Sequence, residues 1–402
     1  MTIQHIAALG TYLPPWGTDT TRAVNRDEDV VTLAVAAGRS ALTGVDLAEV
    51  RKVVLVSRDL PLLEGGNSAP LLAGLGLPGN VLVREAIGNG PATLSELGDA
   101  SAGTLVIGAD LAPAGAAAAF VGASGASVRT VDRVNRSMPI VTRDGHGSTT
   151  EYADPRLLRV RGINASIDRL DLSQPIIAAA GLSAKDAASF CQGTPPALPT
   201  TGASAPLFAL AALLDANRHG RLVAVEQGAA VLSELLSGTA PVVRDERPAA
   251  PLPKGTPAPG ASISIALPSY DRNFDAKTRL EAAKCRTCGA LIYPHRFRCP
   301  QCGSEGPCDT VALPREAVIY SMSTIRGQVP GLVSPYSLVI AELGDSGVRL
   351  LVGTTGAVAG SMKIGDTGRL VFRLVAARSG ILDYGYGFLP STNSAITTEV
   401  SA

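Results

Sequence analysis

The chain has 402 residues, 35 of them basic and 35 acidic, and a formal net charge of zero at neutral pH. It therefore carries no overall field that would draw it to nucleic acid or to an anionic membrane. Hydrophobic residues make up 46% of the chain, aromatic residues only 4%, and the mean hydropathy is +0.22. This composition excludes a disordered chain and indicates two or three domains in which helices pack on sheets through small side chains.

The N-terminal segment and the cysteine distribution favour a cytoplasmic protein that does not cross a membrane. Residues 1–17 lack a basic start and a long apolar stretch, so we expect no secretory signal. The longest uncharged run, 111–128, is rich in Ala, Gly and Ser and too weakly apolar for a membrane span. Four of the six cysteines lie within eighteen residues, in two pairs, which indicates a metal site rather than disulfides.

Residues 1–243 alternate apolar strands with helices of small residues, which favours an α/β sandwich. A helix is predicted over Val30–Leu42, and strands are predicted over Lys52–Asp59, Val81–Val83 and Thr104–Asp110. Residues 88–113 and 201–230 share one order of features: a glycine-containing bend, a helix, a C-terminal glycine and a strand. These two segments indicate a duplicated α/β unit.

The stretch REAIGNGPATLSEL, residues 84–97, contains the end of a strand, a tight bend and the start of a helix with Pro91 in its first turn. A bend of this kind aims one side chain into a cleft beside a helix N-terminus, where many enzymes hold a nucleophile. The candidates at the bend are Ile87, Gly88 and Asn89. None of them is a chemically plausible nucleophile.

Composition divides the rest of the chain into four segments. Residues 244–262 contain five prolines and little apolar character, so they indicate a semi-rigid linker. Residues 263–308 hold a short charged helix and the cysteine cluster. Residues 309–395 contain five short β segments separated by Gly, Pro and Asp, which is typical of a small closed barrel of the OB type. Residues 396–402 form a tail.

The cysteine cluster has the spacing of a closed tetrahedral zinc site. In CRTCGALIYPHRFRCPQCGS, two Cys-x2-Cys pairs are ten residues apart, and Gly289 and Gly303 follow them where a tight turn is needed. Two facing knuckles supply four thiolates and leave no open position, so the zinc is expected to fold the ribbon and to do no chemistry. His295 and Cys308 are expected to lie outside the ligand set. The predicted ligands are Cys285, Cys288, Cys299 and Cys302.

A zinc ribbon beside an OB barrel also raises a nucleic-acid hypothesis, because both modules can bind nucleic acid. Residues 271–300 support it with seven basic against three acidic residues. The barrel segments weigh against it, because they mix charges of both signs and show no alternation of aromatic and basic residues. Nucleic acid is therefore the weaker alternative.

The ribbon and three later segments carry a family resemblance: PYSLVIAEL (335–343), KIGDTGRLVFR (363–373) and GYGFLP (385–390). Together they resemble the zinc-ribbon/OB-fold proteins that accompany thiolases and acyl-CoA enzymes. The resemblance implies a module that docks onto a thiolase-fold partner and helps to shelter an acyl-CoA. It does not imply catalysis by the barrel.

Three N-terminal segments carry a second resemblance: IAALGTYLPPW near the start, NRDEDVVTLAVAAGRSAL (25–42) and TGASAPLFALAALL (201–214). They are similar to the opening strand, the first long helix and the second-half helix of the thiolase superfamily, closest to hydroxymethylglutaryl-CoA synthase. The resemblance implies a thiolase-like layered α/β sandwich of duplicated half-domains, ahead of the zinc ribbon and the five-stranded OB-type barrel.

In that family a cysteine thiolate takes the acyl group from CoA, and a histidine and an asparagine complete the site. The resemblance places the cysteine at Ile87, the histidine near Cys191 or Gln192, and the asparagine at about Thr200. An isoleucine has no lone pair and cannot form an acyl-enzyme, and the other two positions depart from the family as well. No catalytic residue is therefore assigned, and neither are the residues that would contact CoA.

Three functions remain open. The favoured one is a non-catalytic or degenerate thiolase-fold subunit that partners a true thiolase in acyl-CoA C–C bond formation or cleavage and helps to bind the CoA thioester. In the second, the chain is itself an acyltransferase or retro-aldolase with a substituted site, in which Cys191 is the nucleophile and His146 the base. The third is a nucleic-acid-binding zinc-ribbon/OB protein.

Overall fold

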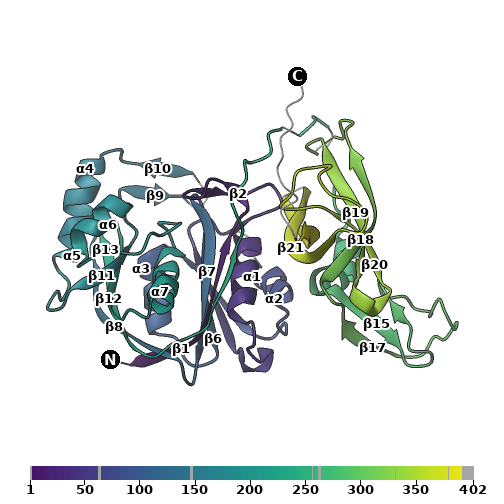
Figure 1. Ribbon diagram of the computed structural model, residues 1–402, viewed down its shortest axis with the longest axis horizontal. Coiled ribbons are helices and arrows are strands. Elements are labelled where there is room, and N and C mark those ends of the chain that lie inside the picture. Colours follow the sequence, from purple (N-terminus) through teal and green to yellow (C-terminus); the bar gives the residue numbers. More distant parts are fainter. Residues whose placement is uncertain are drawn as a thin grey trace.

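The computed structural model describes residues 2–61, 65–144, 148–255, 257–260, 264–330, 332–378 and 380–391. A larger α/β part holds the N-terminal residues, and a smaller β part holds the C-terminal ones (Figure 1). Among the described residues, no helix is long and apolar enough to cross a membrane.

A ten-stranded mixed sheet forms the frame of the α/β part. The strands of its first half lie in the order β5-β4-β6-β7-β1, with β4 parallel to both neighbours and β7 antiparallel to both. The second half joins at β1 and runs β8-β13-β12-β11. The strands are β1 (Ile3–Leu13), β4 (Lys52–Ser57), β5 (Leu82–Ile87), β6 (Thr104–Leu111), β7 (Ala114–Gly122), β8 (Ala126–Asn135), β11 (Ile176–Ala180), β12 (Gly220–Glu226) and β13 (Ala229–Ser237).

The second half of the sheet repeats the topology of the first. β13 lies antiparallel between β8 and β12, as β7 lies between β1 and β6, and β11 is parallel to β12, as β4 is to β6. The position that β5 holds in the first half is taken by a single parallel bridge between Cys191 and Ile176. This repeat confirms the predicted duplication.

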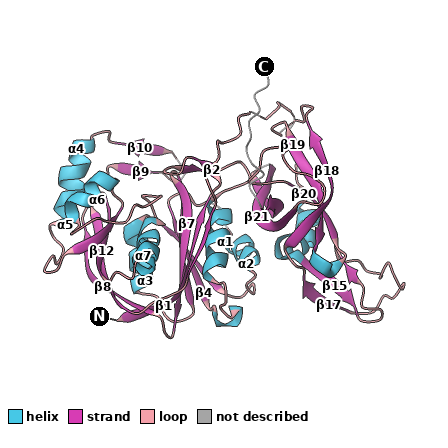
Figure 2. Ribbon diagram, viewed as in Figure 1, coloured by secondary structure: helices cyan, strands magenta, loops and turns pink. Residues whose placement is uncertain are grey.

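The α/β part has five layers (Figure 2). α1 (Val30–Ala41) and α2 (Ser68–Leu75) cover the outer face of the first half, and α3 (Gly90–Gly98) and α7 (Ala205–Asp215) fill the space between the halves. Residues near α5 (Ala165–Ile167) and α6 (Ala184–Phe190) cover the outer face of the second half. The layers confirm the thiolase-like sandwich.

Small residues allow this close packing. A Cβ on Gly10 of β1 would lie 2.1 Å from the Ala41 nitrogen at the end of α1.

α1 begins at a capping box, in which Asp29 accepts from the Thr32 N–H and Thr32 accepts from the Asp29 N–H. The helix predicted over residues 30–42 is confirmed, and it ends one residue earlier, at Ala41.

The proline-rich segment begins as a strand. β14 (Val242–Glu246) pairs in parallel with β1, and Ala250 forms a bridge with Trp16. The expected linker start at residue 244 therefore falls inside a strand of the main sheet. The short run VVRDE carries little strand signal of its own, so its pairing depends on the neighbouring β1.

The C-terminal part contains two small sheets. In the ribbon sheet β15 (Glu281–Cys285) lies between β16 (Leu291–Ile292) and β17 (Cys308–Ala312). The charged helix expected over Ser269–Lys284 is shorter, because α8 (Leu267–Asp275) gives way to a π-type turn (Ala276–Leu280) and then to β15. The barrel strands are β18 (Glu316–Ile325), β19 (Tyr336–Leu343), β20 (Arg349–Gly353), β21 (Thr367–Arg378) and β22 (Ile381–Pro390). Their order β20-β19-β18-β21-β22 is closed by a bridge between Thr354 and Phe388, as expected for the OB type.

The barrel docks on the outer helices of the chain's own α/β part (Figure 1). Phe372, Tyr384 and Phe388 of the barrel belong to the same buried apolar cluster as α1, α2 and the first half of the sheet. Polar contacts also cross the boundary: the Tyr384 hydroxyl donates to Asp29 at 2.6 Å, and the Leu374 N–H donates to the Asp27 carbonyl. The two parts therefore share one core.

Short elements complete the fold. They are β2 (Trp16–Gly17), β3 (Arg22–Ala23), a 3-10 turn (Leu47–Glu49), β9 (Val141–Arg143), β10 (Thr149–Glu151), α4 (Pro155–Leu157), a π-type turn (Leu158–Asn164) and a second 3-10 turn (Gly344–Ser346).

Candidate functional site

The four predicted zinc ligands converge. The sulfur atoms of Cys285, Cys288, Cys299 and Cys302 all lie within 4.8 Å of one another. The Cys285–Cys302 and Cys288–Cys299 sulfur distances are 3.8 and 3.7 Å. Zinc–sulfur bonds of about 2.3 Å place tetrahedral sulfur atoms about 3.8 Å apart, so these two pairs already have the separation expected around a zinc ion.

The local backbone explains this convergence. The N–H groups of Gly289 and Gly303 donate to the carbonyls of Cys285 and Cys299, and both glycines have positive φ angles, 76° and 73°. Backbone N–H groups of Cys288 and Thr287 lower the pKa of the Cys285 thiol to about 6, which favours the thiolate that binds metal. The ribbon's own apolar cluster is small, so a structural zinc would supply much of its stability.

The first turns of the two central helices meet between the halves of the sheet. A Cβ on Gly90, the first residue of α3, would lie 3.4 Å from the Gly202 carbonyl ahead of α7. The Thr93 hydroxyl in α3 donates to the Ala203 carbonyl at 2.7 Å. The bend at residues 87–89 therefore lies beside the start of the equivalent helix of the second half.

Two carboxyl groups occupy this meeting point. Asp110, near the end of β6, accepts from the backbone N–H groups of Ala203 and Ser204 and from the Ser204 hydroxyl, at 2.7, 2.9 and 2.5 Å. Glu226, at the end of β12, accepts from the Asn89 side-chain amide at 2.5 Å. Burial raises the pKa of both carboxyls, although their hydrogen bonds oppose that change.

Ile87 ends β5 and has 70% of its surface exposed. It lines a cavity of about 520 Å³ with Gly88, Arg58, Glu226 and the segment that leads into β9. The Arg58 Nε atom is buried and has no hydrogen-bond partner among the described residues. The cavity beside the bend thus presents an isoleucine, a carboxyl and arginines.

Of the other positions that the family resemblance singled out, only Thr200 lies near this meeting point. Thr200 is buried in the segment ahead of α7, and its hydroxyl shares a hydrogen bond of 2.7 Å with the Ser204 hydroxyl, which in turn donates to Asp110. Cys191 packs instead in the apolar cluster on the outer face of the second half, where burial raises the pKa of its thiol to about 11. Gln192 donates its backbone N–H to Ile176. His146 lies outside the described residues.

The sequence interpretation did not include Asn89, Asp110 or Glu226 as one cluster. The signal was present, because GAD ends one duplicated strand and VEQ ends the other, and both place a carboxylate after a buried apolar run. Only the tertiary contacts show that each carboxylate meets the helix start contributed by the opposite half.

The basic ribbon region is largely paired with acids. Lys277 contacts Asp383, and Arg279 contacts Asp275. Two more ion pairs link Arg286 to Asp309 and Arg298 to Glu305. Four of the seven basic side chains therefore have acidic partners within the chain, which weakens a nucleic-acid surface. His295 is exposed, and Cys308 begins β17 outside the group of four sulfur atoms.

Comparisons with known proteins agree with this architecture. Residues 275–307 match the family model described as ChsH2, rubredoxin-like zinc ribbon domain. The chain is 30% identical over 125 residues to a DUF35 domain-containing scaffold protein of Methanothermobacter thermautotrophicus, a match that covers 93% of that protein and 30% of this chain.

Two solved structures are similar at low identity. An HMG-CoA synthase from Bacillus subtilis, PksG, is 14% identical, with 59% of this chain and 80% of that chain covered and a TM-score of 0.47. An Ltp2-ChsH2(DUF35) aldolase is 24% identical, with 34% of this chain and all of that chain covered and a TM-score of 0.27. The strand order and layers of the chain itself define its thiolase-like part. Through its relation to the scaffold proteins, the chain belongs to the DUF35 domain-containing family, and it carries a thiolase-like sandwich in the same polypeptide.

Proposed function

We propose that this chain is a non-catalytic thiolase-fold scaffold subunit. It partners a catalytically competent thiolase-family protein in the formation or cleavage of C–C bonds in acyl-CoA substrates, and it helps to hold the CoA thioester. The observation that carries the proposal is the chemistry of the meeting point of α3 and α7, where Ile87, Gly88 and Asn89 supply no nucleophile.

The carboxyl groups at this point support a structural role. A helix N-terminus stabilises negative charge, such as a thiolate or a developing oxyanion. At the start of α7, Asp110 already accepts from the backbone N–H groups of Ala203 and Ser204. Asn89, which precedes α3, is bound to Glu226. Two backbone donors ahead of α7 and the Asn89 amide ahead of α3 are thus bound to carboxylates of the chain itself.

Arginines beside the bend support thioester binding. Arg58, Arg136 and Arg143 line the cavity of about 520 Å³ together with Met138 and Val141. Apolar side chains with a few cationic groups suit a ligand with an acyl chain and phosphates. We therefore place the CoA thioester in this cavity.

The exposed edge of the sheet supports a protein partner. β5 is the last strand of its half, and among the described strands it pairs with β4 alone. Leu82 at its start is 62% exposed and Ile87 at its end is 70% exposed. An edge strand with exposed large apolar residues is a template for pairing with another chain, and sheet-edge pairing is the interface that the thiolase resemblance implies.

Acyl transfer tests the absence of a nucleophile. The purified zinc-loaded chain is incubated with acetyl-CoA, and its intact mass is recorded together with the release of free CoA. We expect no acyl adduct and no CoA release. An Ile87→Cys variant shows whether a thiol at this position can be acylated and whether the assay detects the acyl adduct. An acyl adduct on the unmodified chain would instead support the enzyme hypothesis and refute the scaffold function.

Co-expression with a thiolase that retains its cysteine tests the partnership. Native mass measurement should show a complex, and acetyl-CoA should label only the thiolase. Leu82→Lys on β5 should prevent the complex, whereas Leu351→Lys, which changes an exposed leucine on the barrel strand β20, should leave it intact. Equal loss or equal retention in the two variants would contradict pairing through β5.

A further inference from the structure

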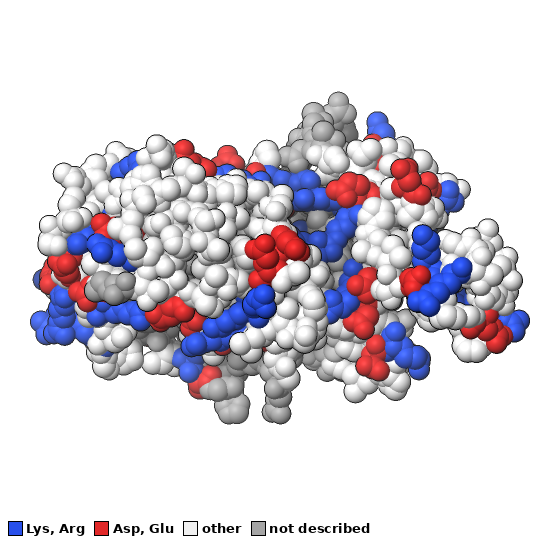
Figure 3. All heavy atoms as spheres, turned by 90° about the horizontal axis from the view of Figure 1, so that it is seen from below, with Lys and Arg blue, Asp and Glu red and all other residues white. Residues whose placement is uncertain are grey.

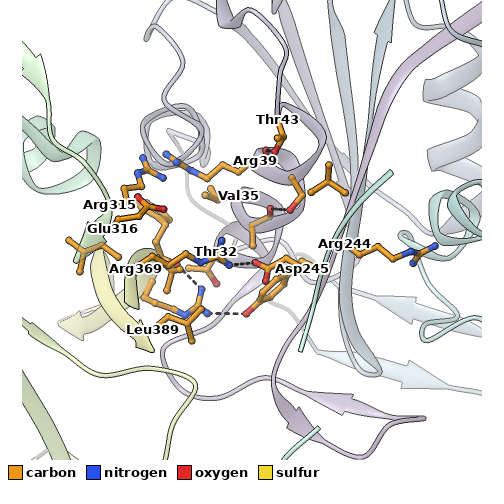
Figure 4. A pocket seen from close by; sticks show the side chains of 18 residues that line it. Thr32, Val35, Arg39, Thr43, Arg244, Asp245, Arg315, Glu316, Arg369 and Leu389 are labelled. Carbon is orange, nitrogen blue, oxygen red and sulfur yellow. Dashed lines mark hydrogen bonds and ion pairs between the residues drawn. The ribbon is translucent and has the colours of Figure 1, made fainter. Parts of the chain in front are cut away.

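A second cavity lies at the boundary between the α/β part and the barrel, away from the bend at residues 87–89. Its volume is about 360 Å³, at the lower end for small-molecule pockets. Residues of α1 and β14 form one wall, and β21, β22 and the residues that begin β18 form the other. Figure 4 shows Arg39 on the α1 wall and Arg315, Glu316 and Arg369 on the barrel wall.

Basic side chains outnumber acidic ones around this cavity. Five arginines and two carboxylates line it. Figure 3 also shows basic side chains gathered where the two parts of the molecule meet. The lining residues with charge are Arg39, Arg244, Arg315, Arg369, Arg373, Asp245 and Glu316.

Two of these arginines are fully used within the protein. Arg244 pairs with Asp215 and Glu246 at 2.5 and 2.8 Å. Arg373 lies 3.3 Å from Glu28 and donates to the Tyr12 hydroxyl. Neither guanidinium is therefore left to bind a ligand.

Arg369 is only partly used. Its Nη2 atom contacts Asp245 at 2.6 Å, whereas its Nε atom is buried without a hydrogen-bond partner among the described residues. A buried donor without a partner is rare in proteins and is often satisfied by a ligand or water. The protein's own groups thus satisfy Arg369 only in part, and its side chain stays 41% exposed.

The positive charges of Arg39 and Arg315 are the least neutralised by acidic side chains. In the part of the chain that the structure describes, neither has a carboxylate within ion-pair distance. The Arg39 Nε atom donates to the Gly74 carbonyl, but its Nη2 atom is buried and unpaired. Arg315 donates to the Tyr386 hydroxyl at 3.0 Å. Burial lowers the pKa of Arg315, the charges of Tyr386 and Glu316 oppose that change, and the positive charge of Arg369 adds to it. Because the net pKa is lowered, an anion at this place would stabilise the charged guanidinium.

We propose that this cavity binds a phosphorylated small molecule, whose phosphate is held by Arg39 from α1 and by Arg315 and Arg369 from the barrel. The planar guanidinium groups match phosphate oxygens in pairs of hydrogen bonds, and the charges of Arg39 and Arg315 have no carboxylate within ion-pair distance among the described residues. The apolar side chains of Val35 and Leu389 line the same cavity and suit the remainder of a phosphate ester. Because such a ligand contacts both parts, it stabilises their docked arrangement.

Calorimetric titration of the full zinc-loaded chain tests the site with three probes: inorganic pyrophosphate, ADP and adenosine. We expect pyrophosphate and ADP to bind and adenosine, which lacks phosphate, not to bind. Arg39→Gln and Arg315→Gln should each weaken binding by about tenfold or more, as expected when one charge-assisted contact is lost. The matched control is Arg349→Gln, because Arg349 is an exposed barrel arginine that pairs with Glu342.

Each outcome decides the proposal. Binding of pyrophosphate and ADP with equal affinity supports a site for phosphate alone, and tighter binding of ADP supports a nucleotide or a related ester. Absence of binding by both, or equal affinities in Arg39→Gln and Arg349→Gln, overturns the proposal. If Arg315→Gln does not fold, Arg315→Lys, which keeps the charge, replaces it. Unchanged affinity for pyrophosphate and ADP in both Arg315→Lys and Arg39→Gln again refutes the proposal. These titrations contain neither a thiolase nor an acyl-CoA. Their outcome therefore does not depend on whether the proposed scaffold function is correct.

Discussion

Replacing Arg373 by methionine should destabilise the chain by about 3–5 kcal/mol at neutral pH, because the change leaves a buried carboxylate without its cation. Arg373 is 2% exposed, and its Nη2 atom lies 2.9 Å from the Tyr12 hydroxyl and 3.3 Å from Glu28. Its Nε atom also donates to Thr355. Since Arg373 lies on β21 of the barrel and Glu28 lies just ahead of α1, the loss weakens the docking of the two parts.

The predicted loss depends on pH. Burial raises the pKa of Glu28, and Arg373 opposes that rise, so the pKa of Glu28 should rise further in the variant. A carboxyl whose pKa is higher in the folded than in the unfolded state costs stability as the pH rises through the folded value. The deficit of Arg373→Met should therefore be largest at neutral pH and narrow as the pH falls towards 5.

Urea unfolding followed by the fluorescence of Trp16, the single tryptophan and a buried one, measures this loss. The control is Arg349→Met, which removes an exposed, solvent-screened ion pair and should leave the unfolding midpoint close to that of the wild type. Adding Glu28→Gln to Arg373→Met should recover part of the stability. If the single variant unfolds at the wild-type midpoint, or the double variant recovers nothing, the buried carboxylate is not the cause.

Three further predictions concern single residues. Metal analysis should find one zinc per chain. The zinc should be lost in Cys288→Ser and retained in Cys308→Ser, because Cys288 belongs to the cluster of four and Cys308 does not. Zinc retained by Cys288→Ser would exclude that ligand set. Gly202→Ala should lose about 1–3 kcal/mol, because its Cβ would lie 1.9 Å from Asp110, whereas Gly327→Ala has open space; equal thermal midpoints would contradict this. Iodoacetamide should modify Cys191 about a hundredfold more slowly than a free thiol at pH 8, because burial raises the pKa of Cys191 to about 11. The rate of modification should rise with pH. Rapid labelling at pH 8 would show an activated thiol.

The sequence predicted those features that depend on spacing or on local order. The four zinc ligands followed from two Cys-x2-Cys pairs, and the bend at residues 87–89 followed from GNGP between an apolar run and a helix. The duplicated segments predicted the repeated strand order, because similar local sequences fold into similar strand–helix units. These features need few contacts from distant parts of the chain.

Other features depend on tertiary neighbours. Asp110 and Glu226 each end a buried strand, as many solvated acids do, and only the opposing helix start gives them hydrogen-bond partners. The sequence did not predict that the barrel docks on α1 of the same chain, although α1 carries a signal for it. Its sequence VVTLAVAAGRSA is small or apolar on nearly every side, and such a helix is buried on both faces.

The shared core of the two parts makes the polypeptide difficult to divide. A break within residues 251–260 would separate two fragments, and each would expose the apolar surface that the other now covers. Such fragments should need each other to remain folded and should reassociate without a covalent connection. Keeping both on one chain fixes their ratio at synthesis, so neither half is left with an uncovered surface in the cell.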